Sequence, residues 1–334
     1  MTLRSWLTAI GLLAISSAAA FAAEPAPELV SIEKIWDAGR HNTFTDLIRF
    51  QDRFWCTFRE ADGHVGGDGK IRILVSEDGA KWESAALLTE ERIDLRDPKL
   101  SITPGGMLMC VMGGSVYDGK TLLGRQPRVA FSSTGHEWSA PKRVLTEGDW
   151  LWRVTWKGDT AYGAAYRTVP RQNADGKPET EWLLSLYSSP DGQKWTRVTD
   201  LEVPNRANET TLRFVGDEMI ALARREQGNQ KGWIGASKPP YTEWKWHETE
   251  HRFGGPNFVA IGDDLWAGSR SYPGGAKMVL ARMSRDSYEP VLTFPSGGDT
   301  SYPGFVWHDG LLWMSYYSSH EGKTAIYLAK IRLE

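Results

Sequence analysis

Hydrophobic and polar positions alternate along this chain in short runs, with little of the three-to-four-residue spacing that a helix produces. The runs are rich in Val, Ile, Trp, Tyr and Phe, as in Phe-Trp-Cys-Thr-Phe at residues 54–58. Gly, Asp, Asn and Pro divide them. Short alternating runs with such boundaries are typical of β-strands, so the pattern predicts an all-β fold.

The predicted strands form hairpins that recur along the chain at a spacing of roughly 50 residues. First strands begin near residues 42, 96, 152, 208, 255 and 301. The return strands end at Arg59, Met112, Arg167, Arg224, Arg270 and Tyr316. Each unit has room for four short strands. The repeat therefore predicts a six-bladed β-propeller of four-stranded antiparallel blades.

A second repeat has the form Ser-x-Asp-Gly-x-x-Trp. It occurs at residues 76–82 and 189–195, with a degenerate copy at 132–138 and weaker echoes at 237–244 and 284–286. In such a turn Asp and Ser accept hydrogen bonds from backbone amides and Gly adopts a positive φ. We expect Trp to pack under the turn, and we expect these turns to be structural. They should lie between the third and fourth strands.

The geometry of a blade predicts where a site would form. The first strand runs along the axis and the second returns antiparallel, so the start of one and the end of the other share a face. Side chains from distant parts of the sequence should therefore meet at one mouth of the central channel: Arg59, Asp97, Arg153, Glu209, Arg224, Arg270 and Tyr302. A single arginine there could simply be paired or solvated, but so many polar groups favour a ligand site. Trp150 and Trp152 could stack on a sugar or pack the blade.

The Ser-x-Asp-Gly-x-x-Trp turns resemble the Asp-boxes of the sialidase-like superfamily, whose members include proteins that are not enzymes. The resemblance covers residues from about 30 to 334. Asn208-Glu209, with Arg224 further on, is similar to the sialidase segment that supplies a catalytic Glu and one arginine of a carboxylate-binding triad. Asp299-Thr300-Ser301-Tyr302 resembles the segment that holds a nucleophilic Tyr.

Two more segments carry the resemblance. Arg96-Asp97-Pro98 is similar to a segment whose Asp lines the sugar pocket. Arg59 and the loop at residues 61–70 resemble the region of a substrate-binding Arg and the acid/base Asp. The resemblance implies Asp68 as that acid, with Asp62 and His64 as alternatives. A phenol, with a pKa of about 10, needs a carboxylate to accept its proton, which suits a Tyr302–Glu209 pair.

The chain also departs from the family pattern. Where the family has its first triad arginine, residues 41–46 are His-Asn-Thr-Phe-Thr-Asp, and Arg270 comes several residues early for the third. An arginine fork binds a carboxylate through two parallel bonds, which other residues do not reproduce. A rebuilt anionic pocket could use Arg59, Arg153, Arg167 or Arg225. Equally, the substrate could be another sugar, neutral or uronic.

These residues lead to one function and its alternatives. The leading hypothesis is a secreted exo-glycosidase that hydrolyses a terminal acidic sugar, sialic acid first. It uses Tyr302 and Glu209 as the nucleophile pair and Asp68 as the acid/base. Its substrate-binding residues would be Arg224, Arg59, Asp97, Arg270, Arg153, Arg167, His64 and Trp152. The alternatives are a hydrolase or polysaccharide lyase for a different sugar, with His64 or Tyr302 abstracting the proton, and a non-catalytic glycan-binding propeller.

Charge and hydropathy limit the classes of partner that this chain could bind. The net charge of −3 shows no basic excess for nucleic acid. Arg4, the apolar run at 6–20 and Ala20-Phe21-Ala22 predict a signal peptide at residues 1–22. Export to the periplasm or beyond the cell follows, with residues 23–334 as one propeller domain. No other segment could span a membrane, for which about 20 apolar residues are needed. Cys56 and Cys110 should be buried thiols, and no metal or organic cofactor is implied.

Overall fold

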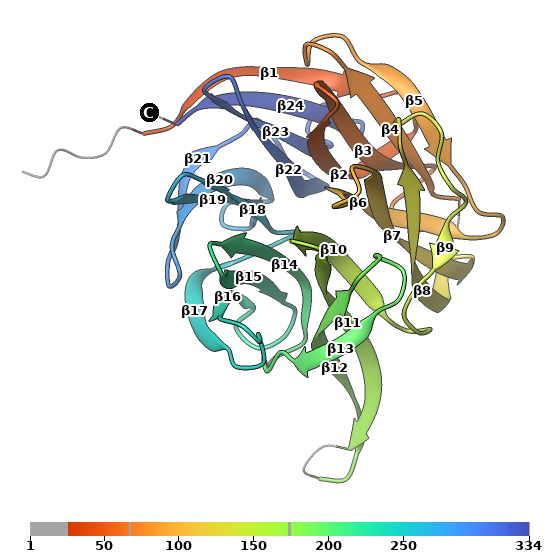
Figure 1. Cartoon of the computed structure of the whole chain (residues 1–334), viewed down its shortest axis with the longest axis vertical. Coiled ribbons are helices and arrows are strands. Elements are labelled where there is room, and N and C mark those ends of the chain that lie inside the picture. Colours follow the sequence, from red (N-terminus) through yellow and green to blue (C-terminus); the bar gives the residue numbers. More distant parts are fainter. Residues whose placement is uncertain (1–25, 67, 173–174, 334) are drawn as a thin grey trace, which may run out of the picture.

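The computed structural model describes residues 26–66, 68–172 and 175–333 (Figure 1). All regular structure within these ranges is β-strand, arranged as six four-stranded antiparallel sheets around a central axis. The predicted six-bladed propeller is confirmed. The expected signal peptide, residues 1–22, lies outside the described residues. Within them, no helix has the length and apolar character needed to cross a bilayer.

Each blade takes its four strands in sequence, apart from the last. Blades one to three are β2 (His41–Phe50), β3 (Arg53–Ala61), β4 (Lys70–Ser76), β5 (Glu83–Leu88); β6 (Asp94–Ile102), β7 (Leu108–Asp118), β8 (Thr121–Ser132), β9 (Lys142–Arg143); and β10 (Trp150–Lys157), β11 (Thr160–Gln172), β12 (Pro178–Ser189), β13 (Thr196–Asp200). Blades four to six are β14 (Ala207–Val215), β15 (Glu218–Arg225), β16 (Lys231–Ser237), β17 (Lys245–Arg252); β18 (Asn257–Ile261), β19 (Asp264–Ser271), β20 (Lys277–Met283), β21 (Tyr288–Thr293); and β22 (Thr300–His308), β23 (Leu311–Ser318), β24 (Ala325–Arg332), β1 (Glu28–Trp36).

The ring is closed by its two ends. β1, near the N-terminus, pairs antiparallel with β24 and forms the outer strand of blade six (Figure 1). This pairing covers the edge of β24 and ties the last blade to the start of the chain. Closure of this kind leaves only short, protected edges in a propeller.

The Ser-x-Asp-Gly-x-x-Trp turns bear out their structural interpretation. In the first, Ser76 Oγ accepts from Gly79 N at 2.8 Å, and Asp78 Oδ1 accepts from the amides of residues 80 and 81. The Trp82 indole donates to Gly79 O at 3.1 Å. The turns at 132–138 and 189–195 repeat this pattern. All three join the third and fourth strands of their blades, as predicted.

Each turn also packs on the preceding blade. A Cβ on Gly79 would lie 2.3 Å from the Trp313 ring of blade six, and one on Gly135 would lie 2.2 Å from Trp55 of blade one. Glycine at a positive φ is therefore required twice, by the backbone and by the neighbouring ring. The turns hold adjacent blades together on the face opposite the inner-strand starts. Cys56 and Cys110 are buried free thiols in the core, as expected.

Candidate active site

The inner strands are irregular at the mouth of the channel where they begin. Register shifts fall between Thr43 and Asp46, Arg96 and Lys99, Leu151 and Val154, Ala207 and Thr210, and Ser301 and Gly304. Phe44, Asp97 and Tyr302 lie inside these shifts with φ of 66°, 50° and 57°. Non-glycine residues rarely adopt this region. Such shifts re-aim side chains at a cost in strain, and they cluster beside active sites.

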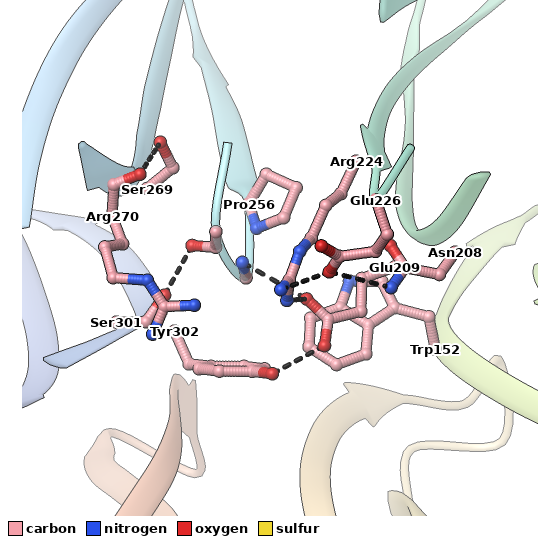
Figure 2. Close-up of polar contacts among 12 residues, drawn as sticks. Trp152, Asn208, Glu209, Arg224, Glu226, Pro256, Ser269, Arg270, Ser301 and Tyr302 are labelled. Atoms are coloured by element: carbon pink, nitrogen blue, oxygen red, sulfur yellow. Dashed lines mark hydrogen bonds and ion pairs between the residues drawn. The ribbon is translucent and has the colours of Figure 1, made fainter. Parts of the chain in front are cut away.

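Tyr302 and Glu209 form the central contact of this mouth (Figure 2). The Tyr302 phenol donates to Glu209 Oε1 at 2.5 Å. The other carboxylate oxygen, Oε2, accepts from Arg224 Nη1 at 2.6 Å and from Gly255 N at 3.2 Å. Both side chains are buried. The structure thus brings the predicted pair together from β14 and β22, which belong to different blades.

Burial and neighbouring charges shift the pKa values of Glu209 and Tyr302 in opposite directions. Burial alone would raise the pKa of Glu209, but the charge of Arg224 and the hydrogen bonds from Tyr302 and Arg224 outweigh it and lower that pKa. Burial raises the pKa of Tyr302 well above its ordinary value, and the charge of Glu209 raises it further. The resting pair is therefore a neutral phenol that donates a hydrogen bond to an ionised carboxylate.

Two arginines flank the pair from blades four and five (Figure 2). Arg224 at the end of β15 is ion-paired with Glu209 and with Glu226. Arg270 at the end of β19 donates to the Tyr272 phenol at 3.1 and 3.2 Å and to a backbone carbonyl at 3.3 Å. Within the described part of the chain, Arg270 forms no ion pair with a carboxylate. Its positive charge is therefore available to an anionic ligand.

Asp97 lies at the shift in β6 and is 8% exposed. Its Oδ1 has no hydrogen-bond partner within the described part of the chain. Burial raises the pKa of Asp97, the charges of Arg96 and Lys99 oppose this, and the net pKa stays above its ordinary value. Asp97 and Glu209 also interact electrostatically. Two carboxyl groups whose pKa values are pushed apart are the usual form of an acid and base pair.

Trp152 and Lys99 pack against the ring of Tyr302. The Trp152 ring is 5.2 Å from that of Tyr302, and its indole donates to Thr211 Oγ1 at 3.1 Å. The Lys99 ammonium lies 4.8 Å from the Trp152 ring and 5.2 Å from the Tyr302 ring. Trp152 is only 1% exposed. It therefore packs against Tyr302 and offers no open face on which a sugar could stack.

His64 is linked to Tyr302 through the ring of Phe44. Its Nδ1 is 2.7 Å from Asp299 Oδ2, and its ring packs edge-on against Phe44 at 5.2 Å. Phe44 in turn contacts the Tyr302 ring at 5.0 Å. The His64 side chain is half exposed. The structure therefore places this predicted residue at the mouth, one aromatic ring away from the Tyr302–Glu209 pair.

Arg59 and Asp68 have partners of their own. Arg59 is fully buried and donates to both oxygens of Asp94, at 2.7 and 2.9 Å. Asp68 accepts from the Asp62 amide at 2.8 Å and lies 4.0 Å from Arg59. The side chain of Asp68 is 43% exposed. Arg59 therefore presents no free guanidinium face to a ligand, and Asp68 belongs to its loop rather than to the pair.

Arg153 and Arg167 also differ from the expected grouping. Arg153 is buried against Asp46 at 2.8 Å and donates to Pro303 O at 3.1 Å. It lines a cavity of about 270 Å³ formed with the far ends of the inner strands, away from the mouth. Arg167, inside β11, donates to Asp149 Oδ1 at 2.7 Å. Strand position therefore predicted neither the cavity that Arg153 lines nor the carboxylates that Arg153 and Arg167 contact.

Several groups at the mouth were missed by the sequence analysis. They are Lys99, Gly255, Tyr272, His41 and Asp299. Lys99 and Tyr272 each lie two residues after a predicted site residue, which is the spacing that returns a strand side chain to the same face. Gly255 contributes a backbone amide, for which the sequence has no signal.

Comparison with known proteins finds similar structures but no similar sequence family. No protein-family model and no curated protein sequence matches the chain. A protein of unknown function from Dyadobacter fermentans DSM 18053 superposes with a TM-score of 0.75 at 18% identity, over 93% of this chain and 100% of that one. An α-L-arabinofuranosidase from Fusarium graminearum gives 0.69 at 14%, over 91% and 98%.

A Trypanosoma rangeli sialidase in complex with the inhibitor DANA gives a TM-score of 0.67 at 11% identity, over 92% of this chain and 60% of that one. The present chain therefore spans less than two thirds of the sialidase. At such identities the likeness is one of fold. The chain shares its six-bladed propeller with structures that include a sialidase and an arabinofuranosidase.

Proposed function

We propose that this protein is a glycoside hydrolase that removes a terminal acidic sugar, with Tyr302 as nucleophile and Glu209 as its base. The observation that carries the proposal is the buried 2.5 Å hydrogen bond from the Tyr302 phenol to Glu209. The names of two fold neighbours, a sialidase and an arabinofuranosidase, support glycoside cleavage as the chemistry. As residues 1–22 predict, the protein would act after export.

The first half of the reaction begins from a neutral phenol and an ionised carboxylate, the protonation states that the two pKa shifts favour. Tyr302 Oη attacks the anomeric carbon and passes its proton to Glu209 Oε1, while the bond from that carbon to the leaving oxygen breaks. A neutral phenol approaches an anionic sugar without charge repulsion. Glu209, kept ionised by Arg224, can accept the proton at neutral pH. In the second half, water attacks the same carbon and gives a proton to the carboxylate that served as general acid, while Glu209 returns its proton to the departing Tyr302 oxygen. Two displacements at this carbon retain the anomeric configuration.

The leaving oxygen needs a proton of its own. We assign it to Asp97, because burial raises the pKa of this carboxyl and leaves Oδ1 without a partner. A general acid with a raised pKa remains protonated closer to neutral pH. Asp68, which the sequence predicts for this role, is in contact with Asp62 and Arg59. Separate Asp97→Asn and Asp68→Asn variants distinguish the two assignments.

The sugar is proposed to be acidic because of the arginine side chains at the mouth. Arg270 has only a phenol and a carbonyl as polar partners in the described ranges, and Arg224 lies beside it. The Arg270 guanidinium can hold a carboxylate that is attached next to the reacting carbon. Arg224 adds positive charge nearby while it remains paired with Glu209 and Glu226. This supports sialic acid first and a uronic acid second.

A second candidate is a two-carboxylate glycosidase for a neutral sugar. It is favoured by the opposite pKa shifts of Glu209 and Asp97, which would make Glu209 the nucleophile and Asp97 the acid. Tyr302 would then only position Glu209. In this mechanism Tyr302→Phe retains substantial turnover, whereas Glu209→Gln does not.

The test is turnover of a panel of aryl glycosides of sialic, uronic and neutral sugars. Wild type, Tyr302→Phe and Glu209→Gln are compared. The proposal expects release of an acidic sugar that both substitutions abolish. Turnover that is unchanged in Tyr302→Phe, or no turnover of any sugar, would contradict it. A product that gains ultraviolet absorbance from a new double bond would instead identify a lyase.

A further inference from the structure

Two histidines and one aspartate converge beside the Tyr302–Glu209 pair without a role in the chemistry above. His41 begins β2, His64 lies in the loop after β3, and Asp299 immediately precedes β22. His41 Nε2 and His64 Nδ1 lie 3.2 and 2.7 Å from the same oxygen, Asp299 Oδ2. One ligand atom from each residue falls within 4.8 Å of the others.

We infer that His41, His64 and Asp299 bind a divalent transition-metal ion, with zinc as its simplest occupant. In a tetrahedral zinc site, bonds of about 2.0–2.1 Å place neighbouring ligand atoms about 3.3 Å apart. The 3.2 Å separation already has this value, and the 2.7 Å one needs to open by about 0.6 Å. His64 lies on a loop and is half exposed, so it is the ligand that can make this adjustment.

The carboxylate is held in place from behind. Asp299 Oδ1 accepts from the Tyr317 phenol at 3.0 Å, and the Asp299 amide donates to Ser319 Oγ at 2.8 Å. Tyr317 is itself fully buried. Oδ2 is therefore left to face the two imidazoles. A hydrogen bond to the second oxygen of a ligating carboxylate is what fixes such a ligand in metal sites.

The histidine rings are also positioned. The rings of His41 and His64 meet edge-on at 5.6 Å, and the His64 ring packs on Phe44 at 5.2 Å. The His41 side chain is 15% exposed, so one wall of the cluster is formed by protein and the other is open at His64. Three protein ligands with one open side are the arrangement of a zinc site that exchanges its fourth ligand.

The donor set selects the metal class. Imidazole nitrogen suits zinc and its neighbours in the first transition row, whereas calcium and magnesium prefer oxygen ligands throughout. The sequence carries no signal for this metal site, because the three ligands lie 23 and 235 residues apart with no motif spacing between them. Only the meeting of blade six with blade one brings them together.

An ion at this position would add positive charge beside the sugar, an inference that rests on the proposed function. Arg224 and Arg270 supply positive charge from blades four and five, while the cluster lies toward blades one and six. A divalent ion bound by two neutral imidazoles and one carboxylate gives that side a net charge of about +1. Its open position could bind a carboxylate or hydroxyl oxygen of the sugar.

The test measures metal binding directly. Tag-free protein is stripped with a chelator and titrated calorimetrically with zinc chloride, then with cobalt(II). We expect one tight zinc site, with a cobalt spectrum typical of four-coordination. His41→Ala and His64→Ala should each weaken zinc binding by more than about 100-fold, and Tyr317→Phe by about 10–100-fold. His247→Ala, at an exposed position on β17, is the matched control and should bind as wild type does.

Zinc uptake by wild type that equals uptake by the His41→Ala and His64→Ala variants would overturn the site. So would an octahedral, purely aqueous cobalt spectrum. Because the readout is binding, the result is independent of catalysis. A protein that binds zinc but cleaves no glycoside retains the metal site and refutes the proposed function. One that cleaves glycosides and binds no zinc does the reverse.

Discussion

The two faces of the propeller differ in how their polar groups are hydrogen-bonded. On one face, the Ser-x-Asp-Gly-x-x-Trp turns satisfy their polar groups within a few residues, as Asp78 does with the two amides that follow it. At the mouth on the other face, polar groups reach across blades. Glu209 of blade four bonds to Tyr302 of blade six. The buried Asp97 Oδ1 has no partner within the described residues.

This difference teaches where strain and unmet hydrogen bonds are tolerated. At the turns, positive φ is given to glycine, as at Gly79 and Gly135. At the mouth, it is imposed on Phe44, Asp97 and Tyr302, which have no such freedom. Strain of this kind persists only where the surrounding structure enforces it, and it collects at functional sites. Substitutions on the two faces should therefore fail in different ways.

The largest expected effect is on turnover. Glu209→Gln keeps the size of the side chain but removes the base that receives the Tyr302 proton. We expect turnover to fall by about 10²–10⁴-fold, with the melting temperature little changed. Glu226→Gln is the matched control, because Glu226 pairs with Arg224 and is one step removed from Tyr302. Equal losses in both variants would show that only the charge of the cluster matters.

The next effect is on stability. Gly79→Ala adds a Cβ 2.3 Å from the Trp313 ring at a φ of +72°, so strain and overpacking combine. Denaturant unfolding should show a loss of about 2–5 kcal/mol, with turnover per folded molecule unchanged. Gly106 has the same φ and no atom within 4 Å of its Cβ position. Gly106→Ala should therefore cost only about 1–2 kcal/mol. Equal costs would remove the packing role of the turn.

A smaller effect is on specificity. Arg270→Lys keeps a positive charge but loses the planar fork beside Tyr272. We expect kcat/KM for the acidic sugar to drop by about 10–100-fold, with little change for a neutral analogue of the same leaving group. If both substrates lose equally, Arg270 supports the fold of the mouth and does not recognise the carboxylate.

The smallest effect is on the pH dependence of stability. Burial and the charge of Arg153 lower the pKa of Lys99 from 10.5 to about 8. Between these values the unfolded chain binds more protons at this residue than the folded one, so the free energy of unfolding rises with pH. The slope is at most about 1.4 kcal/mol per pH unit. Lys99→Met should flatten this part of the curve relative to wild type. An identical curve would show that the pKa of Lys99 is the same in the folded and unfolded chains.

The repeats made the fold predictable, and the site only in part. Hairpin spacing placed Glu209, Arg224 and Tyr302 on one face, and the structure joins them. The same logic placed Arg59 and Arg153 there, yet each is buried against a carboxylate, Asp94 or Asp46. Strand periodicity specifies a face but not a partner from another strand. Contacts between blades one and six, such as His41 with Asp299, have no local signature at all.

The most direct test of the account is to find the atom that carries the sugar during turnover. A fluorinated, activated form of the best substrate from the glycoside panel would slow the second half of the reaction. Digestion and mass spectrometry would then locate the trapped sugar. The account predicts one sugar on the peptide that contains Tyr302. A sugar on the Glu209 peptide, or release of product with inverted configuration and no adduct, would contradict it.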